Sequence, residues 1–444
     1  MKTRFLLYVS SSALALAACG PAASLATPTM AAPLVVTAAS TSEPLPTAAV
    51  VVEGPAATAA PTAEPQPTAP AMVGPDTYPA DVNPLTGETV GADVLERIPL
   101  AVKITNFPVS ARPQFGLAQA DLVFEHQAEA GLTRFTAFFL QNDVDKIGPV
   151  RSARFVDAEI VPAFQAALVT SGSSFGTMDK LRGTAWFLGL DVWRLVSEES
   201  AYSCPPLCRE RPDDSNSLFT STQALRQALA QSAQKAGAAA PGRADLRGLT
   251  FSTSVPTGTP VTDLQVRYSG SAQTLWNYDA TTGRYLRWQE SAPGADLVPH
   301  LDGATNQQLS FANVVLLNVN HQNNFVPEDF RDGGNCGVEI QLWTSGPARV
   351  LRDGVLIEGI WVRDATTDMR LQLRDAAGAP IALKPGNTWF SVVTINSPVE
   401  LAGAAVSVAG KVPDTKSECP IPPTETPDPN ALPTVDPLLT PVVP

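Results

Sequence analysis

The chain has 444 residues, of which 44% are hydrophobic and 16% charged, and its formal net charge at pH 7 is −13. Such an acidic chain, with no basic run beyond its first residues, lacks the electrostatic footprint of a nucleic-acid-binding protein. The excess of carboxylates favours solubility and argues against broad attraction to anionic lipid headgroups.

The first segment has the pattern of an export signal. Lys2 and Arg4 precede an apolar run that ends at Ala18, which is shorter than the about 20 residues that a helix needs to cross a bilayer. Cys19 follows small residues at the expected cleavage point. We therefore expect residues 1–18 to be a lipoprotein signal peptide and Cys19 to carry lipid, which anchors an extracytoplasmic protein to the cell membrane. An ordinary secretory signal with an incidental cysteine is the alternative.

Two segments are too poor in large apolar residues to fold. Residues 19–78 are rich in Pro, Ala and Thr and are expected to form a disordered stalk, and residues 413–444 form a Pro-rich tail. Between them, residues 79–228 and 249–412 are predicted to be two domains. The connector at 229–248 is rich in Ala, Gln and Gly.

The N-terminal block alternates segments typical of strands and helices. Glu129 to Gly131 form a short turn between two strand-like runs, which indicates a hairpin. Alternation of this kind predicts a mixed α/β layer. The expected strands are 98–104, 121–127, 133–140 and 166–170, and the expected helices are a short one after Ser152, ended by Pro162, and another at 175–188.

The C-terminal block contains many short β-like runs separated by turn residues. Asp353-Gly354 is a strong hairpin signal between two of them. Regular strands without intervening helices predict a mainly antiparallel β domain, so the chain as a whole is predicted to be α+β. The expected strands are 264–268, 274–278, 284–288, 314–319, 338–343, 348–351, 357–362, 370–373 and 389–393.

Four cysteines remain once Cys19 is set apart. In an exported protein an even number favours disulfides, and three connectivities are open. Cys204 and Cys208 are spaced to close a small loop, which would leave Cys336 to pair with Cys419. Free thiols are one alternative and a metal site another, although none of the three histidines stands at a familiar ligand spacing.

Four arginines stand in loops or at the ends of predicted elements. A guanidinium group suits carboxylate or phosphate, and a helix N-terminus adds free N–H groups. Two arrangements are open. The arginines could converge on an anion-binding pocket, but the alternative of a structural ion-pair network, in which Glu125 pairs with Arg134 across the hairpin, is favoured. The candidate anion-binding residues are Arg112, Arg134, Arg151 and Arg154, and the candidate polar partners are Asp121, Glu125 and Asn216.

Three weaker patterns also suggest chemistry. Asp121 and Glu125 could hold Mg²⁺ beside a bound phosphate, but pairing of these acids with arginine is favoured. Gly172 to Gly176 have the spacing of a nucleophile elbow centred on Ser174, without an evident base. Aromatic residues flank one turn in the C-terminal block and are interpreted mainly as core, with sugar stacking as the alternative. They are Trp276, Tyr278, Tyr285 and Trp288.

Several strings occur in order over about residues 80 to 400, and the most specific is Gly148-Pro149-Val150-Arg151-Ser152-Ala153-Arg154. Others are Asn83-Pro84-Leu85-Thr86-Gly87, Ala111-Arg112-Pro113-Gln114, Trp276-Asn277-Tyr278-Asp279, Gly359-Ile360-Trp361-Val362-Arg363 and Pro385-Gly386-Asn387-Thr388-Trp389. On these strings the chain resembles the YerB-like family of bacterial lipoproteins, whose folded part is a two-part domain of unknown function. The resemblance implies an exported, lipid-anchored protein with two conjoined domains and no established reaction.

The chain departs from the family pattern at two expected histidines. Thr170 and Ser171 stand where a His followed by Gly-Gly-Ser is expected, and Ser215-Asn216 replaces a His-Asn pair. The loss of both weakens any mechanism that depends on a histidine base.

The expected function is non-catalytic: a membrane-anchored lipoprotein that binds an anionic envelope component, such as a cell-wall polymer, or an envelope protein. No cofactor, metal or nucleic acid is expected. The alternative is an enzyme that acts on phosphate-bearing glycopolymer or lipid-pyrophosphate substrates, in which arginines stabilise charge on the leaving group. A structural spacer is a third possibility.

Overall fold

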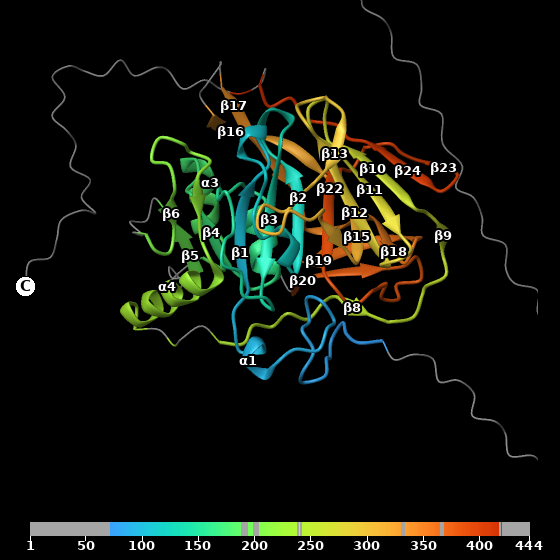
Figure 1. Cartoon of the computed structure of the whole chain (residues 1–444), viewed down its shortest axis with the longest axis horizontal. Coiled ribbons are helices and arrows are strands. Elements are labelled where there is room, and N and C mark those ends of the chain that lie inside the picture. Colours follow the sequence, from blue (N-terminus) through green and yellow to red (C-terminus); the bar gives the residue numbers. More distant parts are fainter. Residues whose placement is uncertain are drawn as a thin grey trace, which may run out of the picture. The chain divides into compact units, whose positions relative to one another are not determined.

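The computed structural model describes residues 72–187, 194–198, 204–237, 239, 242–329, 334–364, 368–416 and 419 (Figure 1). The predicted signal peptide, Cys19 and nearly all of the predicted stalk and tail lie outside these residues. The residues described belong to one compact unit.

A mixed sheet of eleven strands forms the centre of this unit and contains strands from both halves of the chain. The order along it is β20-β19-β18-β15-β22-β2-β3-β1-β4-β5, and β9 adds to β19. Strands β2 and β22 pair in parallel, so the two predicted domains share one sheet. The strands are β1 Leu100–Thr105, β2 Leu122–Gln127, β3 Thr133–Phe139, β4 Ala167–Thr170, β5 Leu195–Ser197, β9 Thr259–Pro260, β15 Asn313–Val319, β18 Thr344–Arg352, β19 Val355–Asp364, β20 Asp368–Arg374 and β22 Thr388–Thr394.

The central strands are buried on both faces, which explains their nearly continuous apolar sequences. All residues of β1, β2, β3, β15 and β22 are buried. Strands β1, β2, β4, β5, β15 and β22 run in the same direction. Their carboxyl ends therefore meet at one edge of the sheet, the place where open α/β sheets commonly hold ligands.

A second sheet of seven strands covers one face of the first. Its order is β13-β12-β11-β10-β24-β23, with β14 beside β12. The buried Trp276 contributes to the core between the sheets, where its ring lies 5.3 Å from that of Trp389. The interpretation of this aromatic residue as core is thus confirmed. The strands are β10 Asp263–Arg267, β11 Gln273–Asp279, β12 Arg284–Glu290, β13 Leu297–Pro299, β14 Ser310–Phe311, β23 Val399–Ala402 and β24 Ala405–Ala409.

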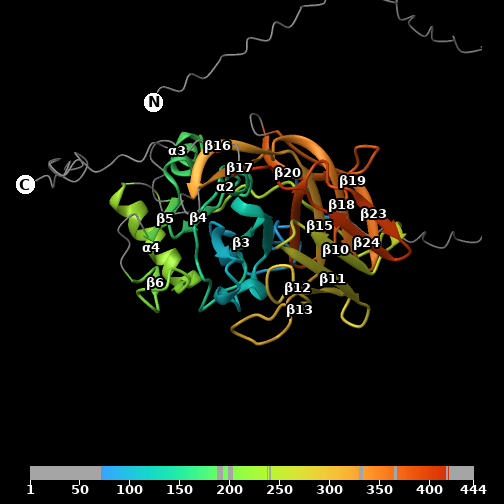
Figure 2. The ribbon, with the colours of Figure 1, turned by 90° about the horizontal axis from the view of Figure 1, so that it is seen from above.

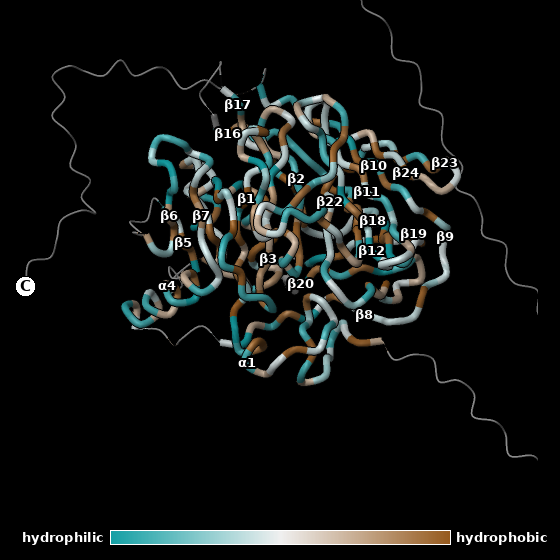
Figure 3. Tube along the Cα trace, in the orientation of Figure 1, coloured by the Kyte–Doolittle hydropathy of each residue, from teal (hydrophilic) through white to brown (hydrophobic). Residues whose placement is uncertain are grey.

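Two short helices and a hairpin cover the other face (Figure 2). They are α2 Asp157–Ala163, α3 Phe175–Gly183, β16 His321–Asp329 and β17 Asn335–Ile340. A third helix, α4 Thr222–Lys235, buries Leu225 and Leu229 and is hydrophilic at its outer end (Figure 3). The remaining elements are α1 Ala92–Leu95, η1 Val109–Ala111, η2 Leu117–Gln119, η3 Glu129–Gly131, β6 Cys208–Arg209, β7 Leu218–Phe219, β8 Thr250–Phe251 and β21 Ala382–Leu383.

Most predicted strands are present, and the α+β class describes the mixed, largely β structure. The Asp353-Gly354 turn joins β18 and β19, and positive φ angles of 52° and 73° at its two residues fit a type I′ turn. The helix expected directly after Ser152 starts instead at Asp157 and contains Pro162. Pro162 is tolerated because it lies near the end of a short helix, where a proline removes few backbone hydrogen bonds.

The fold extends beyond the boundaries predicted from composition. Val73, in the predicted stalk, bridges Phe251, and Thr415, in the predicted tail, is buried. Both expected disulfides, Cys204–Cys208 and Cys336–Cys419, are confirmed, and the second ties the tail segment to β17. Among the residues described, no helix is both long and apolar enough to cross a membrane.

Candidate anion-binding site

Three of the four candidate arginines gather at the edge where the parallel strands end. Arg134 is the second residue of β3, which starts at this edge. Arg151 and Arg154 lie in the segment 148–156, which crosses the end of β1, where Arg151 N donates to Lys103 O at 3.1 Å. The positive charges of Arg151 and Arg154 both act on Arg134. The structure thus brings together arginines from β3 and from the segment 148–156.

Arg134 is the member of this cluster whose charge has no paired carboxylate. Its side chain is buried. The Nη1 atom donates to the backbone carbonyl of the preceding residue, Thr133, at 3.2 Å, and the Nε atom has no hydrogen-bond partner among the residues described. Burial and the charge of Arg154 lower the pKa of Arg134 to about 9, with Glu129 acting in the opposite direction. An arginine remains charged at neutral pH, so this site carries a positive charge that lacks a counter-ion.

Arg154, in contrast, is paired. Its guanidinium donates to Glu129 Oε2 at 2.7 Å, and its backbone N–H donates to Asp157 Oδ2 at 2.6 Å. Burial opposes both charges of the Arg154–Glu129 pair, but their mutual attraction is stronger, so the pKa of Arg154 is raised and that of Glu129 is lowered. The pair is therefore ionised and fixes the position of a second guanidinium beside Arg134.

Arg151 lies next to the loop that contains Asn216. Its Nη1 donates to Ser215 O at 2.9 Å, and it makes a further interaction besides this hydrogen bond. Asn216 is half-buried, and its side-chain oxygen has no partner among the residues described. The candidate polar partner Asn216 thus lies beside one arginine of the cluster.

Arg112 does not join the other three arginines. It lies on the side of the second sheet, where its guanidinium pairs with Glu290 at 2.5 Å and donates to Asn106 Oδ1 at 3.0 Å. The expectation that all four arginines converge is therefore corrected. Arg112 belongs to an ion pair, as the structural alternative predicts.

Asp121 and Glu125 do not form a shared site. Asp121 accepts hydrogen bonds from amide groups at the amino end of β2, and burial raises its pKa to about 6. Glu125 pairs with Arg287 at 2.8 Å. The predicted pairing of Glu125 with Arg134 is wrong because His126 is the residue opposite Arg134, which places Glu125 on the other face. Among the residues described, no His, Cys, Asp and Glu side chains group as metal ligands would.

Sequence reasoning missed a buried polar network directly beneath the arginine cluster. Lys103 Nζ donates to Asp157 Oδ1 at 2.8 Å, to Thr136 Oγ1 at 2.6 Å and to His126 Nε2 at 2.9 Å. Burial lowers the pKa of Lys103 to about 8 and that of His126 well below its usual range. Asp157 links this network to the Arg154 backbone, so the network positions the arginine loop. A lysine in the middle of an apolar strand sequence was the available signal.

A second missed network lies between the two sheets. Arg287 bonds both Glu125 and His300 Nδ1, and its guanidinium carbon is 4.5 Å from the centre of the Trp389 ring. The His300 ring is held at its other nitrogen by Gln114 at 2.8 Å. Because Arg287 and Glu125 are 1% and 2% exposed, this network is structural and closed to ligands.

The serine-rich loop serves to start α3. Ser174 is the N-cap and accepts from Thr177 N at 3.1 Å, and Ser173 donates to a backbone carbonyl. His321, the remaining histidine, bonds Val319 O. No histidine is hydrogen-bonded to these serines among the residues described, which is contrary to what a nucleophile elbow requires.

The β16–β17 hairpin brings another acid to the cluster. Glu328 accepts a hydrogen bond from Thr177 Oγ1, and burial raises its pKa although Arg154 acts to lower it. Strand β17 also contacts η3, the turn that contains Glu129. The hairpin and η3 thus flank the arginines on the side away from the strands.

Comparison with known proteins identifies the family. The N-terminal and C-terminal domain models of DUF3048, each described as a protein of unknown function, match residues 85–236 and 264–390. The chain is 28% identical over 325 residues to "Putative lipoprotein YerB" of Bacillus subtilis, which covers 72% of this chain and 88% of that protein. The crystal structure of Bacillus subtilis YerB matches with a TM-score of 0.56 and 26% identity, over 70% of this chain and 96% of the other.

The two domain models cover all of the strings named above except Asn83 and Pro84, and they include the segment that contains Arg151 and Arg154. The chain belongs to the YerB-like family of lipoproteins, whose two-part folded region is DUF3048.

Proposed function

We propose that this protein is an extracytoplasmic lipoprotein, anchored to the cell membrane through Cys19, whose folded part binds an anionic component of the cell envelope without catalysis. Residues 19–78 would act as its stalk. The binding site would be the cluster of Arg134, Arg151 and Arg154 at the carboxyl edge of the main sheet.

One observation carries the proposal: Arg134 is a buried guanidinium without a paired carboxylate. Burial of an uncompensated charge is costly, and structural arginines such as Arg112 and Arg363 avoid that cost by pairing with glutamate. An anion that binds at Arg134 would supply the missing counter-charge. The positions of Arg154 and the Lys103 network support this, because they hold further positive charge beside it.

Phosphate is the group that such a cluster fits best. Phosphate accepts several hydrogen bonds at once, and guanidinium groups present N–H donors in a fixed plane. Hydrogen bonds to charged groups contribute roughly 1.5–3 kcal/mol each, so loss of Arg134 should weaken binding at least about tenfold.

The test is binding of the purified full chain to inorganic phosphate and to cell-wall sacculi, with their anionic polymers either retained or removed. Wild type should bind phosphate and the polymer-bearing sacculi, and Arg134→Gln should lose both. Arg374→Gln is the matched control, since Arg374 lies in the edge strand β20, six strands away from β3, and contacts Gln372.

Equal binding by wild type and Arg134→Gln would contradict the proposal, as would no binding by wild type. Thermal unfolding of each variant checks that it is folded. Release of phosphate-bearing fragments from the sacculi by wild type would support the enzymatic alternative instead.

A further inference from the structure

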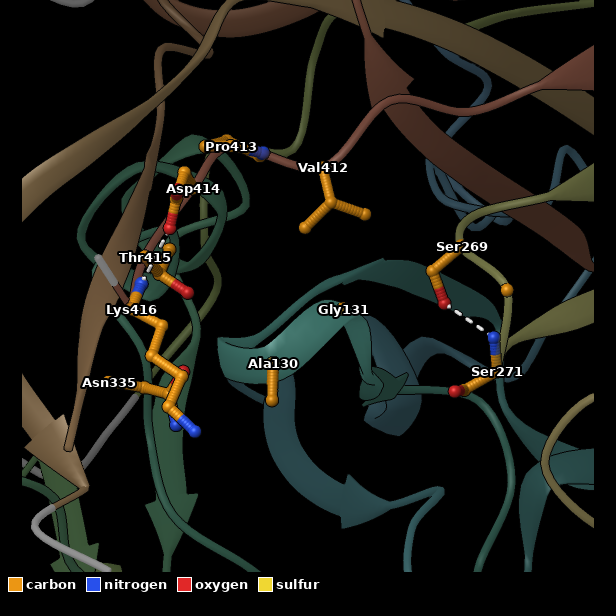
Figure 4. Close-up of a pocket in the computed structure, with 11 residues that line it drawn as sticks. Ala130, Gly131, Ser269, Ser271, Asn335, Val412, Pro413, Asp414, Thr415 and Lys416 are labelled. Atoms are coloured by element: carbon orange, nitrogen blue, oxygen red, sulfur yellow. Dashed lines mark hydrogen bonds between the residues drawn. The ribbon is translucent and has the colours of Figure 1, made fainter. Parts of the chain in front are cut away.

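An open hollow of about 520 Å³ lies beside Ala130 and Gly131 of η3 (Figure 4). Four segments form its walls: η3, the turn between β10 and β11, the start of β17, and the chain after β24 that leads to the Cys336–Cys419 disulfide. Its size lies within the range of small-molecule sites. The lining residues are Ala130, Gly131, Ser269, Gly270, Ser271, Asn335, Val412, Pro413, Asp414, Thr415 and Lys416.

The hollow and the arginine cluster share two structural elements. Ala130 and Gly131 of η3 line the hollow, while the preceding residue, Glu129, pairs with Arg154. On the hairpin, Asn335 lines the hollow at the end of β16–β17 where the loop joins the two strands, opposite Asp329 and so near Glu328. A ligand with its anionic group at Arg134 could therefore place its remaining part in the hollow.

Unused hydrogen-bonding groups stand on two opposite sides of the hollow. Ser269 and Ser271 lie on one side, and Asn335 and Lys416 on the other (Figure 4). Ser269 Oγ accepts from Ser271 N at 3.0 Å, which leaves its own O–H to donate. Among the residues described, the Ser271 hydroxyl, the Asn335 amide and the Lys416 ammonium group have no side-chain hydrogen-bond partner.

This lining discriminates between classes of ligand. A lipid tail needs a continuous apolar wall, whereas the apolar contribution here is limited to small groups such as Ala130, Val412 and Pro413. The hydroxyl groups of a ligand both donate and accept hydrogen bonds, so they can pair with the serine, amide and ammonium groups of this lining. The chemistry of the hollow therefore fits a polyol or sugar.

We propose that the ligand of this protein is a sugar phosphate or polyol phosphate, and that the hollow holds its hydroxyl-bearing part while the arginine cluster holds its phosphate. This inference rests on the proposed function and deepens it by naming the ligand class. The phosphate supplies attraction at Arg134, and the hydroxyl groups supply selectivity at Ser269, Ser271 and Asn335.

The experiment compares two ring phosphates that differ in their hydroxyl groups. Glucose 1-phosphate, cyclohexyl phosphate and inorganic phosphate are titrated into the full chain by calorimetry. Wild type should bind glucose 1-phosphate at least about tenfold more tightly than the other two. Equal affinities for all three, or a preference for cyclohexyl phosphate, would overturn the inference.

A blocking variant then locates the effect. In Ser271→Trp an indole ring fills the hollow, and the affinity for glucose 1-phosphate should fall to that for cyclohexyl phosphate. Ala280→Trp is the matched control, because Ala280 is exposed in the turn at the other end of β11. Ser271→Ala keeps the backbone hydrogen bond to Ser269 and should lower the affinity for glucose 1-phosphate by less than Ser271→Trp does. A loss in this mild variant would show that the weaker binding is not caused by misfolding.

The two proposals fail in different ways. If phosphate binding depends on Arg134 but glucose 1-phosphate has no advantage, or if Ser271→Trp binds it as tightly as wild type, the sugar-phosphate inference is overturned alone. If wild type binds none of the three anions, the proposed function is overturned and the inference with it.

Discussion

The two faces of strands β2 and β3 carry polar networks of opposite character. On the face toward the second sheet, Arg287 bonds both Glu125 and His300, and all three side chains are buried. On the other face, His126 is hydrogen-bonded to Lys103, and Arg134, which lies opposite His126, has a guanidinium without a paired carboxylate among the residues described. Neighbouring residues on a strand thus belong to the closed network or to the proposed binding site according to the face they occupy.

This difference shows why the number of arginines near a site is a poor guide to function. Arg287 is buried like Arg134 and Arg112 is partly buried, yet each of these two is paired with a glutamate. What distinguishes Arg134 is the absence of a carboxylate partner within the residues described. The comparison therefore predicts opposite outcomes when charges are removed from the two faces.

The largest effect is expected on the closed face. Glu125→Leu leaves Arg287 buried without its counter-ion and should lower the free energy of unfolding by about 3–5 kcal/mol. Chemical denaturation measures this change. The double variant Glu125→Leu, Arg287→Met removes both charges and should be more stable than the single variant. An equal or lower stability of the double variant would show that the ion pair itself is a major source of stability.

Acid should destabilise both faces through their histidines. Burial lowers the pKa of His321 to about 4 and those of His126 and His300 well below the usual range. In the unfolded chain they take up protons near pH 6.5, so stability is fully present above that pH and is lost as the pH falls toward 4. Each contributes roughly 1.4 kcal/mol per pH unit within this window. Asp121 offsets part of this loss of stability, because its raised pKa lets the folded protein bind a proton near pH 6, before the unfolded chain does.

Denaturation at pH 7, 6 and 5 measures this slope. His321→Phe should flatten it by about one third, because His321 makes its hydrogen bond only to Val319 O among the residues described. A wild-type stability that is unchanged between pH 7 and pH 5 would contradict buried neutral histidines.

A smaller effect is expected at the start of α3. Ser174→Ala removes an N-cap and should cost about 1 kcal/mol of stability. Phosphate binding should be unchanged, since Ser174 is assigned a structural role. Thermal unfolding and phosphate titration measure the two quantities. Loss of phosphate binding without loss of stability would instead place this serine in the site.

The sequence predicted elements better than their assembly. The strand runs, the hairpin turn at Asp353-Gly354 and both disulfides follow from local patterns or cysteine spacing. The pairing of β2 with β22 joins residues more than 250 positions apart, and neither strand's pattern specifies a partner. A shared sheet could therefore not be foreseen from composition, which indicated only two blocks and a connector.

The candidate site was also predictable only where it depends on residues that are close in the sequence. Convergence of the arginines was one of the two arrangements considered from the sequence, and Arg134, Arg151 and Arg154 do gather at one edge of the sheet. Arg112 was misplaced because its partner Glu290 lies on a strand of the second sheet, 178 residues away. The error for Glu125 was one of register, since a shift of one residue moves a side chain to the opposite face.

The most direct test is the stability of Arg134→Met with and without inorganic phosphate. Without phosphate the variant should be more stable than wild type by about 0.5–1 kcal/mol, because an uncompensated charge is removed, at the cost of function. Phosphate should raise the melting temperature of wild type and leave that of Arg134→Met unchanged. A less stable variant, or an equal rise of the melting temperature with phosphate in both proteins, would contradict the claim that Arg134 is an uncompensated charge that binds an anion.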